Sequence, residues 1–227
     1  MIYNPYPGSF FATEGIDGSG KTAQLDLLVS WLEGLNLKVF RTKEPDKNGI
    51  YGKLIYRDLA DPNGLHVRDP KMFQSWYACD SRRNVQDQVI GPISSPSRRN
   101  VVLSDRFRAS MVYGAKSAKD LPELMASTEA IMGELFIWPD AILIFDVSVV
   151  VAMKRLKEKG RPVDGHENEK KLAKVRSLYR AFARKYPGAC HIISAEDDLG
   201  TVAHRVRRIV RRVLIQKGQW NLPSVEE

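Results

Sequence analysis

Short apolar runs alternate with longer stretches of helical periodicity along the chain. The runs are rich in β-branched and aromatic residues, as buried strands are, and lie at residues 9–13, 38–42, 100–104, 141–145 and 191–194. After the first run, four apolar residues follow the i, i+3, i+4, i+7 spacing of an amphipathic helix, namely Leu25, Leu28, Val29 and Leu32. Strands that alternate with helices form parallel sheets covered by helices on both faces. We therefore predict an α/β fold with a five-stranded parallel sheet, in a single domain over residues 1–227.

A glycine-rich segment follows the first predicted strand. Residues 14–22 read EGIDGSGKT, which fits the pattern G-x-x-x-x-G-K-[ST] with Gly15, Gly20, Lys21 and Thr22. The predicted strand ends at Thr13 and the predicted helix begins near Lys21, so the segment has the strand–loop–helix setting that the motif requires. Glycines allow successive backbone N–H groups to converge on a phosphate, and the helix N-terminus adds partial positive charge.

The glycine loop predicts a P-loop NTPase fold. In such a loop Lys21 contacts the β- and γ-phosphates of a nucleoside triphosphate, and Thr22 holds Mg²⁺. The loop alone does not decide the reaction, because GTPases, motors and small-molecule kinases share it. The chain has no N-K-x-D guanine signature, which argues against a GTPase.

An acid and a base follow the third predicted strand. Asp105 and Arg106 come directly after the run at 100–104, and the carboxyl ends of parallel strands border the crevice in which ligands bind. Asp105 is expected to hold Mg²⁺ or its water, with helix capping as the alternative. Arg106 is expected to clamp a second phosphate. Asp146 is a rival for the metal, although capping of the next helix is the favoured interpretation.

The positive charge of the chain is local. The net charge is +8, and residues 201–218 carry five arginines, one lysine and no acid, so about +2 remains elsewhere. Valines and an isoleucine recur in this segment at helical spacing, which predicts an amphipathic helix with its apolar side inward. The alternative is a nucleic-acid surface, but the arginine cluster contains no aromatic residue for base stacking.

Other features of the composition exclude several protein classes. No run of eighteen apolar residues exists, and the opening MIYNPYPG lacks the regions of a signal peptide. Cys79 and Cys190 are the only cysteines, and neither has a metal-ligand spacing. We expect a reduced, cytoplasmic protein that does not enter a membrane.

The order of the motifs resembles the thymidylate kinase family. That family has the P-loop, then T-R-E-P, F-x-x-D-R, D-R-Y and P-D motifs, and finally a lid. The corresponding stretches here are EGIDGSGKT (14–22), TKEP (42–45), YACDSRR (77–83), SDRFRASMVYG (104–114), WPDAILIFDV (138–147) and GRPVDGHE (160–167). The resemblance extends from about Phe10 to Ala195. It implies phosphoryl transfer from ATP, with Mg²⁺, to a deoxynucleoside monophosphate, dTMP by default, and a homodimer.

The resemblance also implies roles for individual residues. Asp17 would contact the sugar 3′-hydroxyl, Arg106 the acceptor phosphate, and Tyr113 the sugar. Tyr77 would stack on the base, with core packing beside Phe73 and Trp76 as the alternative interpretation. The expected nucleotide-binding residues are Gly15, Asp17, Gly18, Ser19, Gly20, Lys21 and Thr22. The expected substrate-binding residues are Asp17, Lys43, Glu44, Pro45, Tyr77, Arg82, Arg106, Ser110 and Tyr113.

A lid is expected at residues 157–171. Because Gly18 stands where some members of the family have a P-loop arginine, Arg161 in the lid is the expected catalytic arginine, beside Lys21, Asp105 and Arg106.

The chain departs from the family pattern at several positions. Ser81 replaces the arginine expected four residues after the stacking aromatic, and Arg82 follows it. Lys43 replaces the arginine of T-R-E-P, Tyr113 lies one residue closer to Asp105, and Gly165 follows Asp164 in the lid. Two alternatives stay open: a kinase for another deoxynucleoside monophosphate or for a nucleoside, and a P-loop protein in which ATP regulates nucleic-acid binding through residues 201–218.

Overall fold

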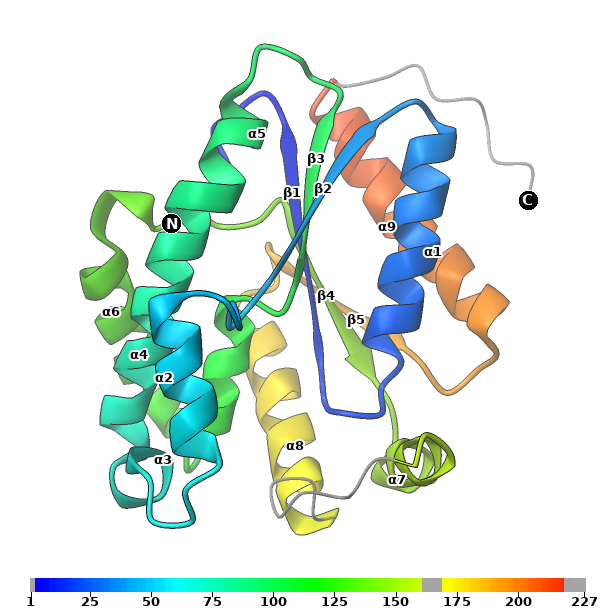
Figure 1. Ribbon diagram of the computed structural model, residues 1–227. Coiled ribbons are helices and arrows are strands. Elements are labelled where there is room, and N and C mark those ends of the chain that lie inside the picture. The colour runs from blue at the N-terminus through cyan, green and yellow to red at the C-terminus, as the bar shows by residue number, and fades with distance from the viewer. Residues whose placement is uncertain (1–2, 161–168, 219–227) are drawn as a thin grey trace.

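The computed structural model describes residues 3–160 and 169–218 (Figure 1). Its five strands form one parallel sheet, as the apolar runs predict, and their order in the sheet is β2-β3-β1-β4-β5. The strands are β1 (Ser9–Gly15), β2 (Lys38–Lys43), β3 (Asn100–Asp105), β4 (Ala141–Asp146) and β5 (Cys190–Ser194).

The central strands are the most buried. Every residue of β1 and β3 is buried, whereas β2 at the edge has exposed or half-buried residues throughout. Parallel pairing aligns the carboxyl ends of neighbouring strands: Thr13 in β1 and Lys43 in β2 both pair with Asp105 in β3. The sheet therefore brings the carboxyl ends of β1, β2 and β3 together at one edge.

Helices cover both faces of the sheet (Figure 1). Helices α1 and α9 pack together on one face, and α4, α5 and α6 lie on the other. The helices are α1 (Lys21–Gly34), α2 (Ile50–Leu59), α3 (Leu65–Arg68), α4 (Pro70–Asn84), α5 (Ile90–Ser94), α6 (Leu121–Met132), α7 (Val149–Glu158), α8 (Glu169–Lys185) and α9 (Leu199–Gln216). A π-helical turn η1 (Val85–Val89) joins α4 to α5, and three 3₁₀ helices are η2 (Arg108–Gly114), η3 (Ala118–Asp120) and η4 (Gly133–Leu135).

Helix α9 confirms the amphipathic interpretation of the basic segment. Its valines at 202, 206, 210 and 213 are buried, and four of its five arginines line an open groove of about 710 Å³. Trp31 of α1 also lines this groove and gives it an aromatic ring. The guanidinium of Arg207 lies 6.0 Å from the centre of that ring. Trp31 is ten residues beyond Lys21, or about 15 Å along the helix. The nucleic-acid alternative stays a prediction.

Two further expectations concern the cysteines and the membrane. Cys79 and Cys190 are both free thiols. No helix among the described residues is long and apolar enough to cross a membrane. The predicted lid at 157–171 lies between α7 and α8, and its central part, with Arg161, falls outside the described residues.

Candidate active site

The loop between β1 and α1 is open on one side. Gly18 has φ +79°, and a Cβ there would lie 2.4 Å from the carbonyl oxygen of Ala152, so the loop packs directly on α7. Gly20 has φ +91°, yet a Cβ there would meet nothing closer than 3.9 Å. No side chain caps the N-terminus of α1 at Gly20, whereas Asp198 caps α9. No side-chain cap therefore competes with an anion for the first N–H groups of α1.

Lys21 lies within this loop. Its Nζ donates hydrogen bonds to the carbonyl oxygens of Gly15 at 2.8 Å and Ile16 at 2.9 Å. Burial lowers its pKa to about 8, and the charge of Arg106 acts in the same direction, while Asp17 opposes it. A phosphate oxygen would be a stronger acceptor for this ammonium than the two carbonyls are.

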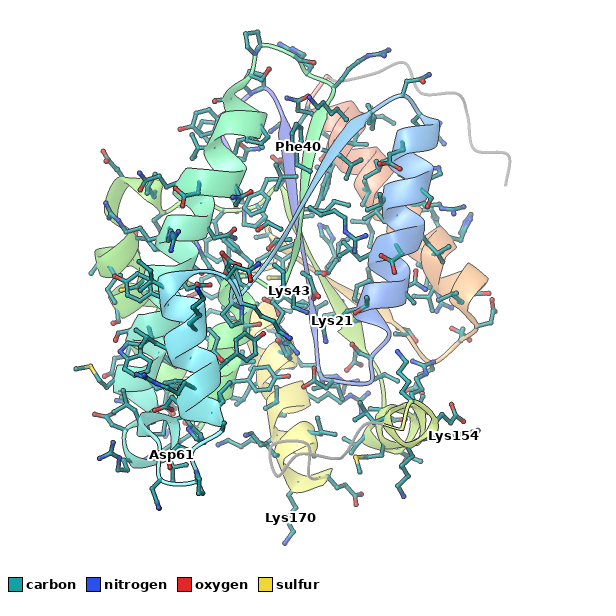
Figure 2. The ribbon with its side chains drawn as sticks, viewed as in Figure 1. Lys21, Phe40, Lys43, Asp61, Lys154 and Lys170 are labelled. Carbon is teal, nitrogen blue, oxygen red and sulfur yellow. The ribbon has the colours of Figure 1, made fainter. Side chains whose placement is uncertain are left out.

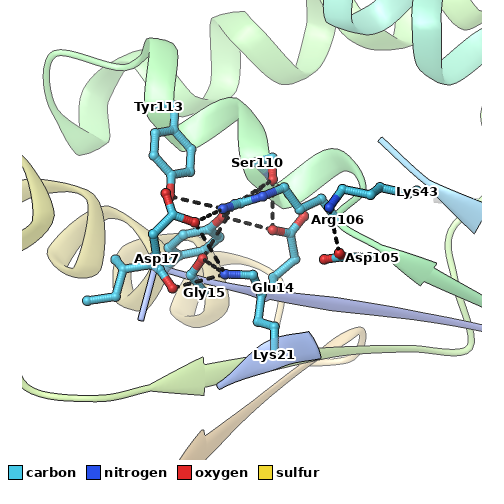
Figure 3. A network of polar contacts seen from close by, with 11 residues as sticks. Glu14, Gly15, Asp17, Lys21, Lys43, Asp105, Arg106, Ser110 and Tyr113 are labelled. Atoms are coloured by element: carbon cyan, nitrogen blue, oxygen red, sulfur yellow. Dashed lines mark hydrogen bonds and ion pairs between the residues drawn. The ribbon is translucent and has the colours of Figure 1, made fainter. Parts of the chain in front are cut away.

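Arg106 joins the two halves of the site (Figure 3). Its Nη2 lies 2.5 Å from a carboxylate oxygen of Asp17 and 3.5 Å from the hydroxyl of Tyr113. Its Nη1 donates to the hydroxyl of Tyr179 in α8 at 3.3 Å. Its backbone has φ +71°, a left-handed conformation that is uncommon for a side chain of this size and that clusters at functional sites. The structure thus brings the predicted Asp17, Lys21, Arg106 and Tyr113 into one network.

Glu14 fixes the backbone that follows Arg106. Its Oε1 accepts hydrogen bonds from the backbone N–H groups of Phe107 at 2.8 Å and Ser110 at 3.0 Å. Its Oε2 accepts from the hydroxyls of Ser110 and Tyr179, both at 2.8 Å. Burial raises the pKa of Glu14, while the charge of Arg106 and these four donors act in the opposite direction. Every lone-pair direction of this buried carboxylate is thus used to hold the turn after Arg106.

The 3₁₀ geometry of η2 explains how Tyr113 reaches the site. A 3₁₀ helix has three residues per turn, so side chains at i and i+3 lie one above the other. Ser110 and Tyr113 are three residues apart within η2, and both contact Arg106, Ser110 through its hydroxyl at 3.5 Å from Nη1. The one-residue shift of Tyr113 relative to the family pattern is therefore absorbed by the local helix type.

Two side chains have the chemistry of magnesium ligands. Mg²⁺ prefers hard oxygen ligands and is usually held by one or two protein groups together with waters and substrate phosphates. The carboxylate of Asp105 at the end of β3 and the exposed hydroxyl of Thr22 at the start of α1 are such groups. Asp105 also lies 3.1 Å from Nζ of Lys43. Across residues 3–160 and 169–218 no cluster of three or more His, Cys, Asp or Glu could hold a metal, so no all-protein cage competes there.

Neither sequence-based role of Asp146 agrees with the structure. The side chain of Ser148 caps α7, so the favoured capping interpretation of Asp146 is wrong. The carboxylate of Asp146 lies 2.7 Å from Nε of Arg176 and 2.6 Å from Nη2 of Arg180. Burial favours a higher pKa, but these hydrogen bonds outweigh it and the pKa is lowered. Two arginines from α8 thus neutralise the charge that a metal would need. Helix capping by Asp105 is not seen either, because no side chain caps η2.

A second group of predicted residues lies between β2, α4 and η2. Glu44 is buried, and its carboxylate accepts hydrogen bonds from the hydroxyl of Ser81 and from Nδ2 of Asn84 at 2.9 Å. Burial raises the pKa of Glu44 to about 8. Asp80 accepts from the backbone N–H of Asp46 at 3.0 Å and thereby ties the segment after Glu44 to α4. Pro45, also buried, follows a cis peptide bond.

Tyr77 packs on Phe73, as its alternative interpretation expects, and its base-stacking role stays a prediction. Its ring packs edge-on against Phe73 with centroids 5.4 Å apart, and it also lines a small cavity with Glu44, Ser81 and Arg106. Arg82 does not join this group. Its side chain is exposed and donates to the backbone carbonyls of Ile131 and Met132 at the end of α6.

Sequence reasoning missed four residues of this region. A charged residue at the end of an apolar strand was a usable signal for Glu14, and Asp80 stands within a recognised motif. Arg108 likewise stands within the stretch at 104–114, two residues after Arg106. Tyr179 carried no sequence signal, because only the packing of α8 brings it to the site.

The sequence of the chain is similar to the sequences of known proteins. A family model described as thymidylate kinase matches residues 13–206. The thymidylate kinase of Thermosipho melanesiensis is 32% identical over 205 residues, which cover 90% of this chain and 98% of that protein. The thymidylate kinase of a Jannaschia species is 31% identical over 218 residues, covering 92% of this chain and 99% of that protein.

A solved structure shows the same fold. The crystal structure of thymidylate kinase from Ehrlichia chaffeensis superposes with a TM-score of 0.64 at 23% identity, over 90% of this chain and 98% of that one.

Proposed function

The chain belongs to the thymidylate kinase family, and we propose that it transfers the γ-phosphoryl group of ATP to dTMP, giving ADP and dTDP. In this reaction a phosphate oxygen of dTMP attacks the γ-phosphorus, and the bond to the β–γ bridging oxygen breaks. The observation that carries the proposal is the single network that joins Lys21 of the P-loop through Asp17 to Arg106, the residue directly after β3. One loop and one strand end thereby hold the cations for two phosphate groups within one network.

Phosphoryl transfer needs alignment and charge compensation more than covalent chemistry. Lys21 and the N-terminus of α1 bind the triphosphate, and the planar guanidinium of Arg106 grips the acceptor phosphate with two parallel hydrogen bonds. Thr22 and Asp105 would hold a Mg²⁺ ion, which would supply positive charge to the phosphates of ATP. Glu14 and Tyr179 prevent Arg106 from rotating, so little reorganisation is needed when the substrates bind.

Asp17 has a second role in this scheme. Its carboxylate neutralises Arg106 at 2.5 Å and lies 3.8 Å from Nζ of Lys21. Once phosphates take both cations, Asp17 becomes available as an acceptor for the 3′-hydroxyl of the deoxyribose. The hydroxyl and the ring edge of Tyr113 then border the sugar.

The test is a screen of acceptors in a coupled assay of ADP release, with dTMP, dUMP, dCMP, dGMP, dAMP and thymidine at equal concentrations, and with dTDP identified by chromatography. We expect the highest kcat/KM with dTMP and slow ATP loss without an acceptor. A higher kcat/KM with another nucleotide, or with thymidine itself, would transfer the proposal to the corresponding alternative. Absence of ADP release with all six would refute it.

Arg161 and the dimer belong to this proposal as well. The family resemblance supports Arg161 as the lid arginine that compensates charge on the transferred group. Arg161→Ala should lower kcat at least ~100-fold with little change in dTMP affinity, and a kcat within threefold of the wild type would reject the role. The resemblance likewise supports a homodimer, for which light scattering during gel filtration should give twice the mass of 25.7 kDa.

A further inference from the structure

Arg108 is a buried charge whose hydrogen-bond donors are unused. The residue is 2% exposed and begins η2, two positions after Arg106. Its guanidinium stacks on the ring of Phe136 with 3.6 Å between its central carbon and the ring centre, and it also lies 4.8 Å from the ring centre of Phe107. Within the described part of the chain, none of its three nitrogens has a hydrogen-bond partner.

This arrangement is costly unless something completes it. A guanidinium has five N–H donors and no acceptor, and burying such donors without partners is unfavourable. The nearby carboxylate of Glu44 accepts hydrogen bonds from Ser81 and Asn84, and Arg108 makes no hydrogen bond to it. The attraction of Glu44 compensates part of the charge, yet burial still lowers the pKa of Arg108 to about 9.

Arg108 lines the same cavity as the predicted base-stacking residue. The wall includes Tyr77, Ser81, Met111 and Thr128, and the cavity also reaches Arg106, whose guanidinium is the expected phosphate grip. A nucleotide held by its phosphate at Arg106 would therefore extend its base toward Tyr77 and Arg108. The cavity measures about 30 Å³, the space of one water molecule. Entry of a base thus requires the walls to move, and the long unbranched side chains of Gln74 and Met111 are suited to this.

The chemistry of Arg108 selects among bases. Thymine and uracil present a carbonyl oxygen at position 4 that can only accept, whereas cytosine presents an amino group that can only donate. A donor-only side chain accepts the first and rejects the second. Ser81 cannot perform this task, because its short side chain donates to Glu44.

We propose that Arg108 donates hydrogen bonds to the 4-carbonyl oxygen of the pyrimidine base and so makes the enzyme selective for thymine and uracil nucleotides over cytosine nucleotides. The inference rests on the proposed function and adds its specificity. This arginine belongs to η2. The family pattern has its arginine in α4, where this chain has Ser81. Stacking on Phe136 holds the guanidinium plane in place without using any of its N–H groups.

The test compares Arg108→Met with the wild type and with Arg83→Met, a control in which an exposed arginine of α4 loses its ion pair with Asp87. The measurements are kcat/KM for dTMP, dUMP and dCMP. For Arg108→Met we expect the ratio of dTMP to dCMP to fall about 30-fold or more, the range of a hydrogen bond to a charged group. Activity with dUMP should fall in parallel with dTMP, and kcat at saturating dTMP should change less than fivefold. Arg83→Met should keep all ratios.

A purely structural arginine gives a different result. Arg108→Met would then lose thermal stability while the ratio of dTMP to dCMP stays within threefold of the wild type, and this overturns the proposal. If the methionine variant does not fold, Arg108→Gln decides: its amide keeps two N–H donors without the charge and adds a carbonyl acceptor, so the ratio of dTMP to dCMP should fall below that of the wild type if the guanidinium reads the base. An unchanged ratio in folded Arg108→Gln, with weaker stability, refutes the role. A wild-type enzyme that does not phosphorylate dTMP defeats the proposed function itself, which is a distinguishable outcome.

Discussion

The two ends of the site handle buried charge in opposite ways. At the phosphate end, Arg106 is hydrogen-bonded to Asp17, Tyr179 and Tyr113, and Glu14 uses both oxygens on donors of the protein. At the base end, Arg108 has aromatic neighbours but no hydrogen-bond partner among the residues that the structure describes. Figure 2 shows the position of Lys21 near the carboxyl ends of the strands, with Lys43 close by at the end of β2.

The contrast indicates a division of labour. The phosphate end is built in advance, because its network holds the cations in place whatever the substrate's base is. The base end is completed by the substrate, so it discriminates: a base that satisfies the waiting donors gains affinity, and one that does not leaves them buried and unpaired. The prearranged phosphate end favours a fast reaction, and the incomplete base end favours selectivity between bases.

The largest effect should come from removing the phosphate grip. Arg106→Ala deletes the guanidinium that aligns the acceptor phosphate, and we expect kcat/KM for dTMP to fall at least ~10³-fold. Arg106→Lys keeps the charge without the fork and should recover less than a tenth of the loss. The measurement is steady-state ADP release, with circular dichroism to verify folding. Activity of Arg106→Ala within tenfold of the wild type would remove Arg106 from the phosphate site.

A second change separates support from contact at the same end. Glu14→Gln replaces one acceptor oxygen with an amide donor that faces the existing donors, so the turn after Arg106 should loosen. We expect a loss of about 2–4 kcal/mol in the free energy of unfolding and a fall in kcat of ~10–100-fold. Ser110→Ala, which removes a single hydroxyl donor to Glu14, is the matched smaller change. If denaturant unfolding shows equal stability for Glu14→Gln and the wild type, Glu14 does not hold the turn.

The smallest effect concerns the pH dependence of stability at the base end. Burial raises the pKa of Glu44 from its usual 4.5 to about 8. A carboxyl whose pKa is raised by folding stabilises the fold fully below the unfolded pKa, and this contribution is lost as the pH rises through the folded pKa. The wild type should therefore lose stability between pH 5 and 8, whereas Glu44→Gln, which cannot ionise, should lose less.

The measurement is urea unfolding at several pH values. The difference in unfolding free energy between Glu44→Gln and the wild type should grow with pH by about 1–3 kcal/mol across this window. Glu123→Gln, an exposed residue paired with Lys71, is the control and should give a flat difference. Parallel curves for Glu44→Gln and the wild type would show that Glu44 is ionised throughout.

The sequence predicted the fold and the phosphate end well because both depend on short-range patterns. Apolar runs and helical spacing are local signals, and each predicted strand is observed within two residues of its predicted limits. The glycine loop is likewise contiguous, so Lys21 and its helix could be placed from a single motif. Arg106 could be placed because the ends of parallel strands share one edge of the sheet.

The base end could not be predicted in the same way. Arg82, one residue from the expected position, was an expected substrate-binding residue, but the rotation of α4 directs it to the surface. Asp146 was a rival metal ligand in the sequence, but in the structure it pairs with Arg176 and Arg180 of α8, thirty or more residues away. The helix type of η2 decided whether Tyr113 faces the site, and a spacing alone does not distinguish a 3₁₀ helix from an α-helix.

The sequence by itself determined the succession of strands and helices along the chain, the P-loop, and the neighbouring Asp105 and Arg106 at the end of β3. The tertiary structure alone decided which buried charges are neutralised by neighbours and which are left for a ligand. The physical reason is that hydrophobic patterns and backbone conformation act over a few residues, whereas the hydrogen-bond partners of a buried guanidinium come from whichever segments the fold packs around it.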